Sequence, residues 1–237
     1  MAGANLHRLE RVIRIRGGVV AADRHHADAE RLQHEKAAIG YYLSGHPFAG
    51  YAAELAPIVR TTIASLAPRS ERMLVAGIVT QLRVQSGRRG KMAFVTLDDG
   101  KGTAEITVWN EAFDAARPLL REDHLVVVEV KVMQRIGEDG DAQSLRIVAE
   151  NVFDLAAVRK RWAKRLTLSC NGNADAGRLA EILGPFRAEG VPVTIHYENG
   201  RVAGDVDLPD DWRVNPDPAL IDRLREWLQP TNVQIVY

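Results

Sequence analysis

Hydrophobic and polar residues alternate in five short runs between residues 73 and 153, a pattern typical of half-buried β-strands. The first three runs read MLVAGIVTQLRVQ, MAFVTLDD and TAEITVWN, and the loops between them contain glycine. The last two read HLVVVEVKVMQR and QSLRIVAENVF, on either side of a polar turn at 137–141. Their richness in Val, Ile, Thr and Phe favours strands over helices.

A helix is predicted between the third and fourth runs. In residues 111–122, apolar side chains recur at helical spacing, at Phe113, Ala116, Leu119 and Leu120. Three strands, a helix and two strands is the connectivity of an OB-fold, a five-stranded barrel. Gly77 interrupts the first run, so we expect a bulge or sharp bend there.

Barrels of this kind bind oligonucleotides over their second and third strands and with their first and last hairpin loops. The first loop region is basic, and no acidic residue occurs from Gln81 to Leu97. The cations there are Arg83, Arg88, Arg89 and Lys91. Such a cluster attracts phosphates, although it is equally typical of a solvated hairpin tip. The last hairpin loop carries carboxylates that would repel phosphate.

Two aromatic residues on the predicted second and third strands have the chemistry to stack on bases. Phe94 lies between Ala93 and Val95, and this setting favours a place in the barrel core over a stacking role. Trp109 shares a strand face with Thr107 and Glu105, so both an outward and a core position stay open.

The chain before the barrel divides into two parts. Residues 1–27 are predicted to be a loosely ordered basic arm, and residues 28–70 a helical lead-in. Within the lead-in, a helix is expected over 28–44 and a second, short one near residues 50–59. The barrel domain is expected to cover residues 71–158.

Residues 159–237 are predicted to form a small α+β domain. Strands are expected at 165–170 and 191–197, and Asn199-Gly200 is a strong hairpin signal. Leu179, Ile182, Leu183 and Phe186 fall on one face of a helix that Pro185 is expected to kink or split, and a last helix begins with Asp217 as N-cap and Pro218 at its first position. Five basic residues between 159 and 165 indicate either a solvated helix face or a phosphate-contacting flank.

Composition excludes several classes of protein. The net charge is zero, so nucleic-acid contact should be local, and one cysteine permits no internal disulfide. No apolar run is long enough for a membrane span and no signal peptide is visible, so a cytoplasmic location is expected. No catalytic, metal or cofactor motif appears, and Asp98-Asp99 are best explained by a turn. We therefore expect no active site.

Three segments carry a resemblance to a known family. EKAAIGYYLSGHPF at 35–48, MAFVTLDD at 92–99, and Trp212-Arg-Val-Asn-Pro216 resemble the alpha subunit of bacterial DNA polymerase III, a replicative polymerase of the C family. The resemblance covers about residues 30–237 and leaves out residues 1–25. The family's catalytic domains have no counterpart in this chain, so it resembles a C-terminal fragment.

The resemblance implies a non-catalytic part of a DNA-directed DNA polymerase. It implies that the OB barrel contacts single-stranded template DNA and that the tail docks the tau subunit of the clamp loader, among other holoenzyme subunits. The nucleic-acid-binding candidates are then Arg83, Arg88, Arg89, Lys91, Phe94, Trp109, Lys131 and Arg135. The partner-binding candidates are Trp212, Arg213 and Trp227, and no cofactor is implied.

Two alternatives stay open at the level of sequence. A free-standing OB-fold protein that binds single-stranded nucleic acid or tRNA would show strong, salt-dependent binding without a partner. An enzyme on an OB-like scaffold would need a polar catalytic cluster, and none is visible.

Overall fold

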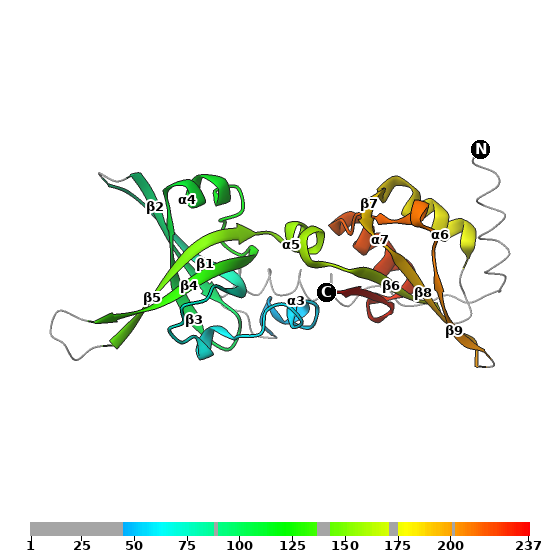
Figure 1. The fold of residues 1–237 in the computed structure, drawn as a ribbon, viewed down its shortest axis with the longest axis horizontal. Helices are drawn as coiled ribbons and strands as arrows, with labels where there is room; N and C mark the ends of the chain where they lie inside the picture. Colours follow the sequence, from blue (N-terminus) through cyan, green and yellow to red (C-terminus); the bar gives the residue numbers. More distant parts are fainter. Residues whose placement is uncertain (1–44, 88–89, 137–142, 171–174, 201) are drawn as a thin grey trace. The chain divides into compact units, whose positions relative to one another are not determined.

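The structure is a computed structural model, and it describes residues 45–87, 90–136, 143–170, 175–200 and 202–237 (Figure 1). The predicted arm at 1–27 and the predicted helix at 28–44 lie outside these residues. The described residues form two compact units, divided between Val158 and Arg159. Each unit has its own hydrophobic core.

The first unit is a closed barrel of five strands in the order β1-β2-β3-β5-β4. A helix, α4 (Asn110–Ala116), separates β3 from β4 along the chain. This arrangement confirms the predicted order of three strands, a helix and two strands. The strands are β1 (Met73–Gly87), β2 (Gly90–Asp98), β3 (Thr103–Trp109), β4 (Leu125–Ile136) and β5 (Gln143–Phe153).

Alternation along the strands builds the barrel core. On β2 the side chains of Ala93, Val95 and Leu97 are buried, whereas the residues between them are only partly covered. On β3, Ile106 and Val108 are buried in the same way. The inner face is therefore filled by small and aliphatic side chains, and every second position faces outward.

The bulge of β1 does not lie at Gly77. The register of β1 against β2 shifts between Val79 and Gln81. Gly77 has a different role, because a Cβ atom added to it would lie 2.9 Å from the backbone oxygen of Asp98. Glycine permits this close approach of the two strand backbones.

Two short helical elements precede the barrel, α3 (Ala49–Leu55) and the 3-10 turn η1 (Ile63–Ser65). Asp99 attaches η1 to the turn between β2 and β3. One of its carboxylate oxygens accepts hydrogen bonds from the backbone N–H groups of Lys101 and Gly102, both at 2.9 Å, and the other accepts from Ile63 at 2.8 Å. The carboxylate therefore has a structural role, as the turn sequence predicts.

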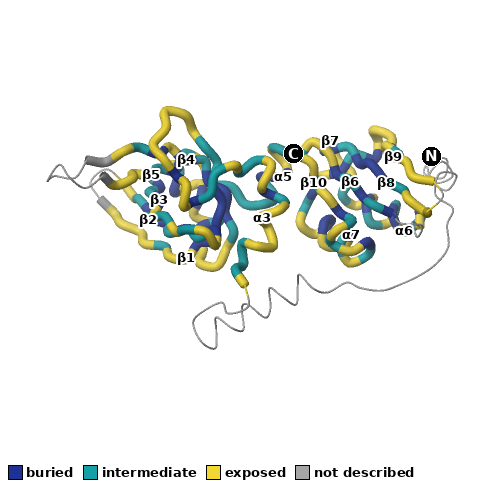
Figure 2. The backbone as a smooth tube through the Cα atoms, turned by 90° about the horizontal axis from the view of Figure 1, so that it is seen from below, coloured by how far each residue is buried: buried dark blue, intermediate teal, exposed yellow. Residues whose placement is uncertain are grey.

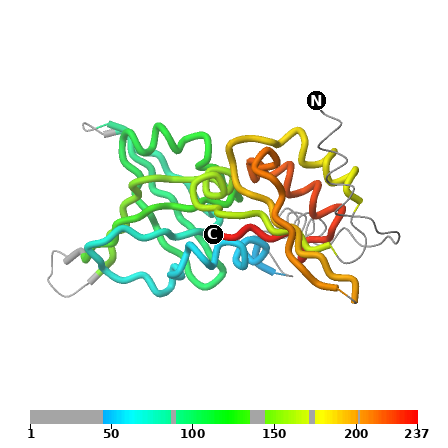
Figure 3. Tube along the Cα trace, turned by 45° about the vertical axis from the view of Figure 1, so that its right-hand side comes forward, coloured from blue at the N-terminus to red at the C-terminus, as the bar shows by residue number. Residues whose placement is uncertain are grey.

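The second unit contains a four-stranded sheet in the order β10-β6-β8-β9. β6 and β8 run parallel, and β10 pairs with β6 at one edge (Figure 3). The strands are β6 (Arg165–Cys170), β8 (Val193–Glu198), β9 (Ala203–Asp207) and β10 (Val233–Val236). A further short strand, β7 (Arg187–Val191), is bridged only to Val214.

Two amphipathic helices supply most of the remaining core of this unit, α6 (Ala176–Leu183) and α7 (Pro218–Leu228). Their buried leucines belong to one core cluster with the buried residues of β6 and β8. Figure 2 shows buried stretches along these helices and strands. Asp217 caps α7 by accepting from the N–H of Ala219, as predicted. Pro185 lies in the 3-10 turn η2 (Gly184–Phe186), directly after α6 ends.

The remaining elements are short. α5 (Leu155–Trp162) follows β5, and the 3-10 turns η3 (Asp210–Trp212) and η4 (Pro230–Asn232) flank α7. Across the residues that the structure describes, no helix is long and apolar enough to cross a membrane.

Candidate nucleic-acid interface

A transverse row of outward-facing residues crosses the barrel wall. The strand registers pair Arg83 with Phe94, Phe94 with Thr107, and Thr107 with Val148. Val148 in turn pairs with Lys131 on β4. On β2, β3, β4 and β5 these positions alternate with buried ones, and Arg83 is exposed on β1, so the row lies on the outer face of all five strands.

Each of the two aromatic rings on this face lies beneath a guanidinium group. The Arg83 guanidinium carbon is 5.6 Å from the centre of the Phe94 ring, and that of Arg146 is 5.9 Å from the ring of Trp109. Both rings are partly buried. Such pairs combine a flat apolar surface for stacking with a positive charge for phosphate.

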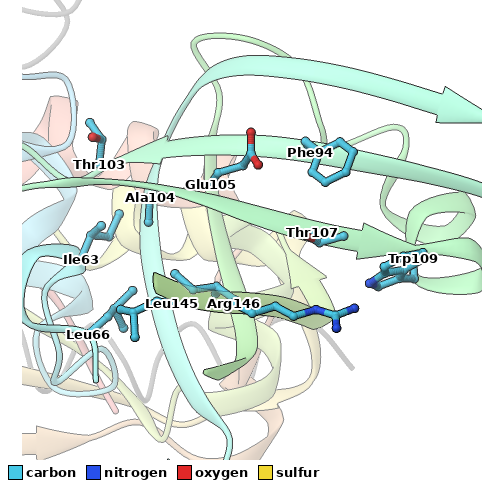
Figure 4. A pocket seen from close by; sticks show the side chains of 11 residues that line it. Ile63, Leu66, Phe94, Thr103, Ala104, Glu105, Thr107, Trp109, Leu145 and Arg146 are labelled. Atoms are coloured by element: carbon cyan, nitrogen blue, oxygen red, sulfur yellow. The ribbon is translucent and has the colours of Figure 1, made fainter. Parts of the chain in front are cut away.

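Phe94, Trp109 and Arg146 line a groove of about 630 Å³ on the outer face of β2, β3 and β5. Figure 4 shows Phe94 and Trp109 at one end and Ile63, Leu66 and Leu145 at the other. The volume lies within the usual range for small-molecule sites. The lining residues are Ile63, Leu66, Phe94, Thr103, Ala104, Glu105, Thr107, Trp109, Leu145, Arg146 and Ile147.

The groove lies where β3 and β5 separate. Their parallel ladder contains three residue pairs, from Ile106–Ile147 to Val108–Ala149. Thr103 and Ala104 on β3, and Leu145 on β5, precede this ladder and line the groove. The separation of the two strands therefore gives the barrel wall its concave surface.

One carboxylate lies in the groove among these cations. Glu105 forms an ion pair with Arg83 through its Oε2 atom, and about half of each side chain is exposed, 46% and 53% respectively. Solvent screens a pair this exposed, so its contribution to stability is small. Its effect on the groove is to hold Arg83 close to the Phe94 ring.

The structure corrects the core interpretation of Phe94. Its ring lies on the outer face, because the interior positions of β2 belong to Ala93, Val95 and Leu97. Trp109 shares an outward face with Thr107 and Glu105, as one of the two sequence interpretations expects. Both aromatic candidates therefore meet in the groove.

The predicted basic residues are spread more widely over the barrel than the two aromatic candidates. Lys91 is exposed near the start of β2, and Lys131 is exposed on β4, outside the groove lining. Arg135 belongs to β4. Arg88 and Arg89 lie outside the described residues, so their role stays a prediction.

Sequence reasoning misses Arg146. Its place in QSLRIVAENVF, next to the buried Ile147, already favours an outward position. Its proximity to Trp109 depends on the parallel pairing of β3 with β5, which local sequence does not reveal. Placing the fifth strand beside the third, as OB connectivity requires, would bring the two together.

The partner-binding candidates of the second unit have different environments. Trp212 is 5% exposed in the core, with Arg187 over its ring at 4.7 Å, so it does not present a surface anchor. Arg213 donates to the backbone oxygen of Gly190 at 3.0 Å and to Asp210 at 3.2 Å. Trp227 is partly buried against the core, beneath Arg178.

The basic residues around α5 do not form one solvated face. Arg159 is 2% exposed, whereas Lys160 and Arg161 next to it are exposed. Within the described residues, no group of three or more His, Cys, Asp or Glu side chains is placed to hold a metal ion.

Comparison with known families defines the class first. Residues 73–155 match the family described as OB-fold nucleic acid binding domain. This range contains all five barrel strands, so the first unit is an OB-fold domain. Residues 178–228, in the second unit, match the family described as DNA polymerase III subunit alpha, C-terminal domain.

Curated relatives extend these matches over most of the chain. The DNA polymerase III subunit alpha of Neisseria meningitidis serogroup A is 34% identical over 88% of this chain, and that of Pseudomonas aeruginosa 36% identical over 88%. The corresponding protein of Escherichia coli K12 is 27% identical over 87%. The chain belongs to the DNA polymerase III alpha-subunit family, and it spans 18% of the length of each of these relatives. The resemblance read from the sequence is confirmed.

Solved structures give weaker likenesses. The second OB-fold domain of replication protein A from Methanococcus maripaludis aligns with a TM-score of 0.30 and 21% identity, over 40% of this chain and 95% of that one. A mitochondrial single-stranded DNA binding protein from S. cerevisiae aligns with a TM-score of 0.31 and 20% identity, over 36% and 94%. The fold assignment rests on the strand order and the family match instead.

Proposed function

We propose that this chain is a non-catalytic, C-terminal part of a replicative DNA polymerase alpha subunit, and that its OB barrel binds single-stranded DNA in the groove of β2, β3 and β5. The observation that supports this best is the pair of rings, Phe94 and Trp109, each beneath an arginine on one concave face. Bases stack on such rings regardless of sequence, and the arginines contact the backbone phosphates.

The geometry favours single strands over duplex. The rings are only partly exposed and line a groove, so a base must leave its own stack to reach them. Unpaired bases already present a free π-face, whereas bases of a duplex do not. The match to the OB-fold nucleic acid binding family supports the same ligand class.

A titration of labelled oligo-dT, at low and at moderate salt, tests the DNA contact. Phe94→Ala/Trp109→Ala should weaken binding, since loss of stacking costs about 1–3 kcal/mol per base. Tyr51→Ala is the matched control, because Tyr51 is an exposed aromatic residue outside the groove lining. Equal affinity of the double variant and the wild type would contradict the proposed groove.

The arginines over the two rings provide a second test of DNA binding. Arg83→Ala/Arg146→Ala should weaken binding and reduce the salt dependence by about one unit of slope per lost phosphate contact. Arg117→Ala/Arg121→Ala removes the same charge from two exposed residues outside the groove lining. Both double variants remove two positive charges, so both weaken the long-range attraction of DNA equally. Only the loss of a local contact can therefore make Arg83→Ala/Arg146→Ala bind DNA more weakly than Arg117→Ala/Arg121→Ala.

For the second unit we propose docking of the tau protein of the clamp loader. The support is the match of residues 178–228 to the family model for the C-terminal domain of the polymerase, together with an acidic balance that disfavours DNA, since residues 198–226 hold eight acidic and four basic residues. DNA synthesis would then belong to other parts of the polymerase.

Purified tau should bind the full chain and a fragment of residues 154–237, but not a fragment of residues 1–164. Biolayer interferometry with each form immobilised measures this directly. Binding of tau only to the 1–164 fragment would refute the assignment of docking to the tail, and would leave the oligonucleotide result unaffected.

A further inference from the structure

Among the described residues that line the groove, one side chain, that of Glu105, carries a carboxylate. Glu105 lines the groove, and its Oε2 atom is paired with Arg83. Among the described residues, the other carboxylate oxygen, Oε1, has no hydrogen-bond partner. An ionised carboxylate only accepts hydrogen bonds, so this atom seeks a donor from the ligand.

The position of Glu105 relative to the Phe94 ring brings that acceptor to the edge of a stacked base. Phe94 pairs with Thr107 across β2 and β3, so Glu105 is its diagonal neighbour on the same outer face. Diagonal neighbours on a sheet lie about 7–8 Å apart, within reach of long side chains. A base stacked on the Arg83 guanidinium that covers the Phe94 ring would have Glu105 within reach of its polar edge, and Figure 4 shows the Phe94 and Glu105 side chains on the same side of the groove.

Bases differ in the hydrogen-bonding groups on their polar edge. Cytosine and adenine carry an exocyclic amino group, which donates, whereas thymine and uracil carry a carbonyl oxygen at the corresponding position. A carboxylate accepts from the amino group of cytosine and repels a carbonyl oxygen. On the basis of the proposed function, we propose that Glu105 makes the groove select single-stranded bases that carry an exocyclic amino group.

Arg83 supports this role of Glu105. By bonding Oε2, it favours one orientation of the carboxylate and leaves Oε1 available to a ligand. Its guanidinium also lies over the Phe94 ring, so its plane and the Glu105 carboxylate lie side by side for one base. Positioning of this kind lowers the entropy lost on binding and raises discrimination between ligands.

Cytosine and uracil are the most direct probes, because they share a ring size and differ at the 4-position. Labelled dC12 and dU12 would be titrated against the full chain at pH 8, where cytosine is neutral. We expect dC12 to bind about threefold to tenfold more tightly, the range for one charge-assisted hydrogen bond reduced by partial solvent exposure.

Glu105→Ala should bring the two affinities to within about twofold of each other, because dC12 loses a hydrogen-bond acceptor for its amino group and dU12 loses a carboxylate that repels its carbonyl oxygen. Glu122→Ala is the control, because it removes the same charge from an exposed residue outside the groove lining. It should leave the dC12 to dU12 ratio unchanged. Circular dichroism of both variants would confirm that they fold.

The outcomes separate this inference from the proposed function. If dC12 and dU12 bind equally to the wild type, and Phe94→Ala/Trp109→Ala weakens both, the groove binds DNA and the selection by Glu105 is refuted. If Glu105→Ala tightens both oligonucleotides by the same factor, Glu105 acts only as a repelling charge, and selection is again refuted. If no oligonucleotide binds even at low salt, the proposed function itself fails.

Discussion

Cys170 is the only cysteine of the chain, and its thiol is buried in the core of the second unit. Burial raises the pKa of the thiol from 9.0 to about 11. The folded protein should therefore resist iodoacetamide at pH 8 and react only after unfolding in urea, because the thiolate is the nucleophile. Mass spectrometry of the alkylated protein checks this, and rapid labelling of the folded chain would contradict it.

The same shift makes stability depend on pH. Above about pH 9 the unfolded thiol loses its proton, whereas the folded one keeps it until about pH 11. The folded state then binds more protons, so the free energy of unfolding should fall across this interval, by up to about 2–3 kcal/mol. Cys170→Ala should show a smaller decrease between pH 9 and 11 in urea unfolding.

Substitution of Asp99 should lower the free energy of unfolding much more than substitution of its neighbour, Asp98. Its buried carboxylate accepts from three backbone N–H groups, and Asp99→Ala leaves these donors without a partner. We expect a loss of about 2–4 kcal/mol in the free energy of unfolding. Asp98→Ala, which removes one bond to the Gly100 N–H and a 3.3 Å contact with the His46 ring, is the comparison. Equal losses in urea denaturation would contradict the role of Asp99.

The two aromatic residues of the groove show how much of the site can be predicted from the sequence. Alternation correctly groups Trp109 with Thr107 and Glu105, since Ile106 and Val108 between them are unambiguously apolar. On β2 apolar residues occupy both faces, so the period of two does not show which face is inside. A core position for Phe94 is therefore the natural prediction, and only the closed barrel shows that smaller side chains fill the interior.

At the level of elements, the predictions succeed wherever a regular period or a cap is present. The five barrel strands, the N-cap of α7 and the break at Pro185 between α6 and η2 all follow from local sequence. β7 is missed, because RAEGV has no alternation and the strand is bridged only to Val214. Its position is decided by distant contacts.

Substitution of Gly190 tests how closely β7 packs against the backbone of Val214. A Cβ atom added there would lie 2.0 Å from the backbone oxygen of Val214, so Gly190→Ala must displace a backbone segment. We expect a loss of at least about 3 kcal/mol in unfolding free energy. Gly204→Ala, on β9, is the matched control with nothing within 4 Å, and its change should stay within about 1 kcal/mol. Similar melting temperatures for the two variants would refute the close approach.

For the whole molecule, zero net charge conceals an uneven distribution of charge. The groove of the barrel carries two arginines over aromatic rings, whereas the tail has an acidic segment. Composition alone predicts weak, local nucleic-acid contact, but cannot locate it. The groove depends on strands that meet only when the barrel closes, and the dC12 and dU12 comparison therefore tests a property that sequence patterns do not indicate.

The division into two compact units leads to a prediction for the whole chain. The 1–164 fragment should bind oligo-dT within about twofold of the full chain, as expected for independent sites, whereas the 154–237 fragment should not bind. Fluorescence anisotropy at one salt concentration measures all three forms. Strong binding by the 154–237 fragment would move the nucleic-acid site out of the barrel.

The short parallel ladder between β3 and β5 has a consequence for motion. Its three residue pairs join strands that are distant in sequence, so their closure carries a larger entropic cost than that of the neighbouring hairpins. The barrel should therefore open first along this line, and the backbone amides that bond across the β3–β5 ladder should exchange with deuterium faster than those that bond across the β4–β5 hairpin. Because the groove follows the same line, the barrel can widen for a bulky purine there while its other ladders stay closed.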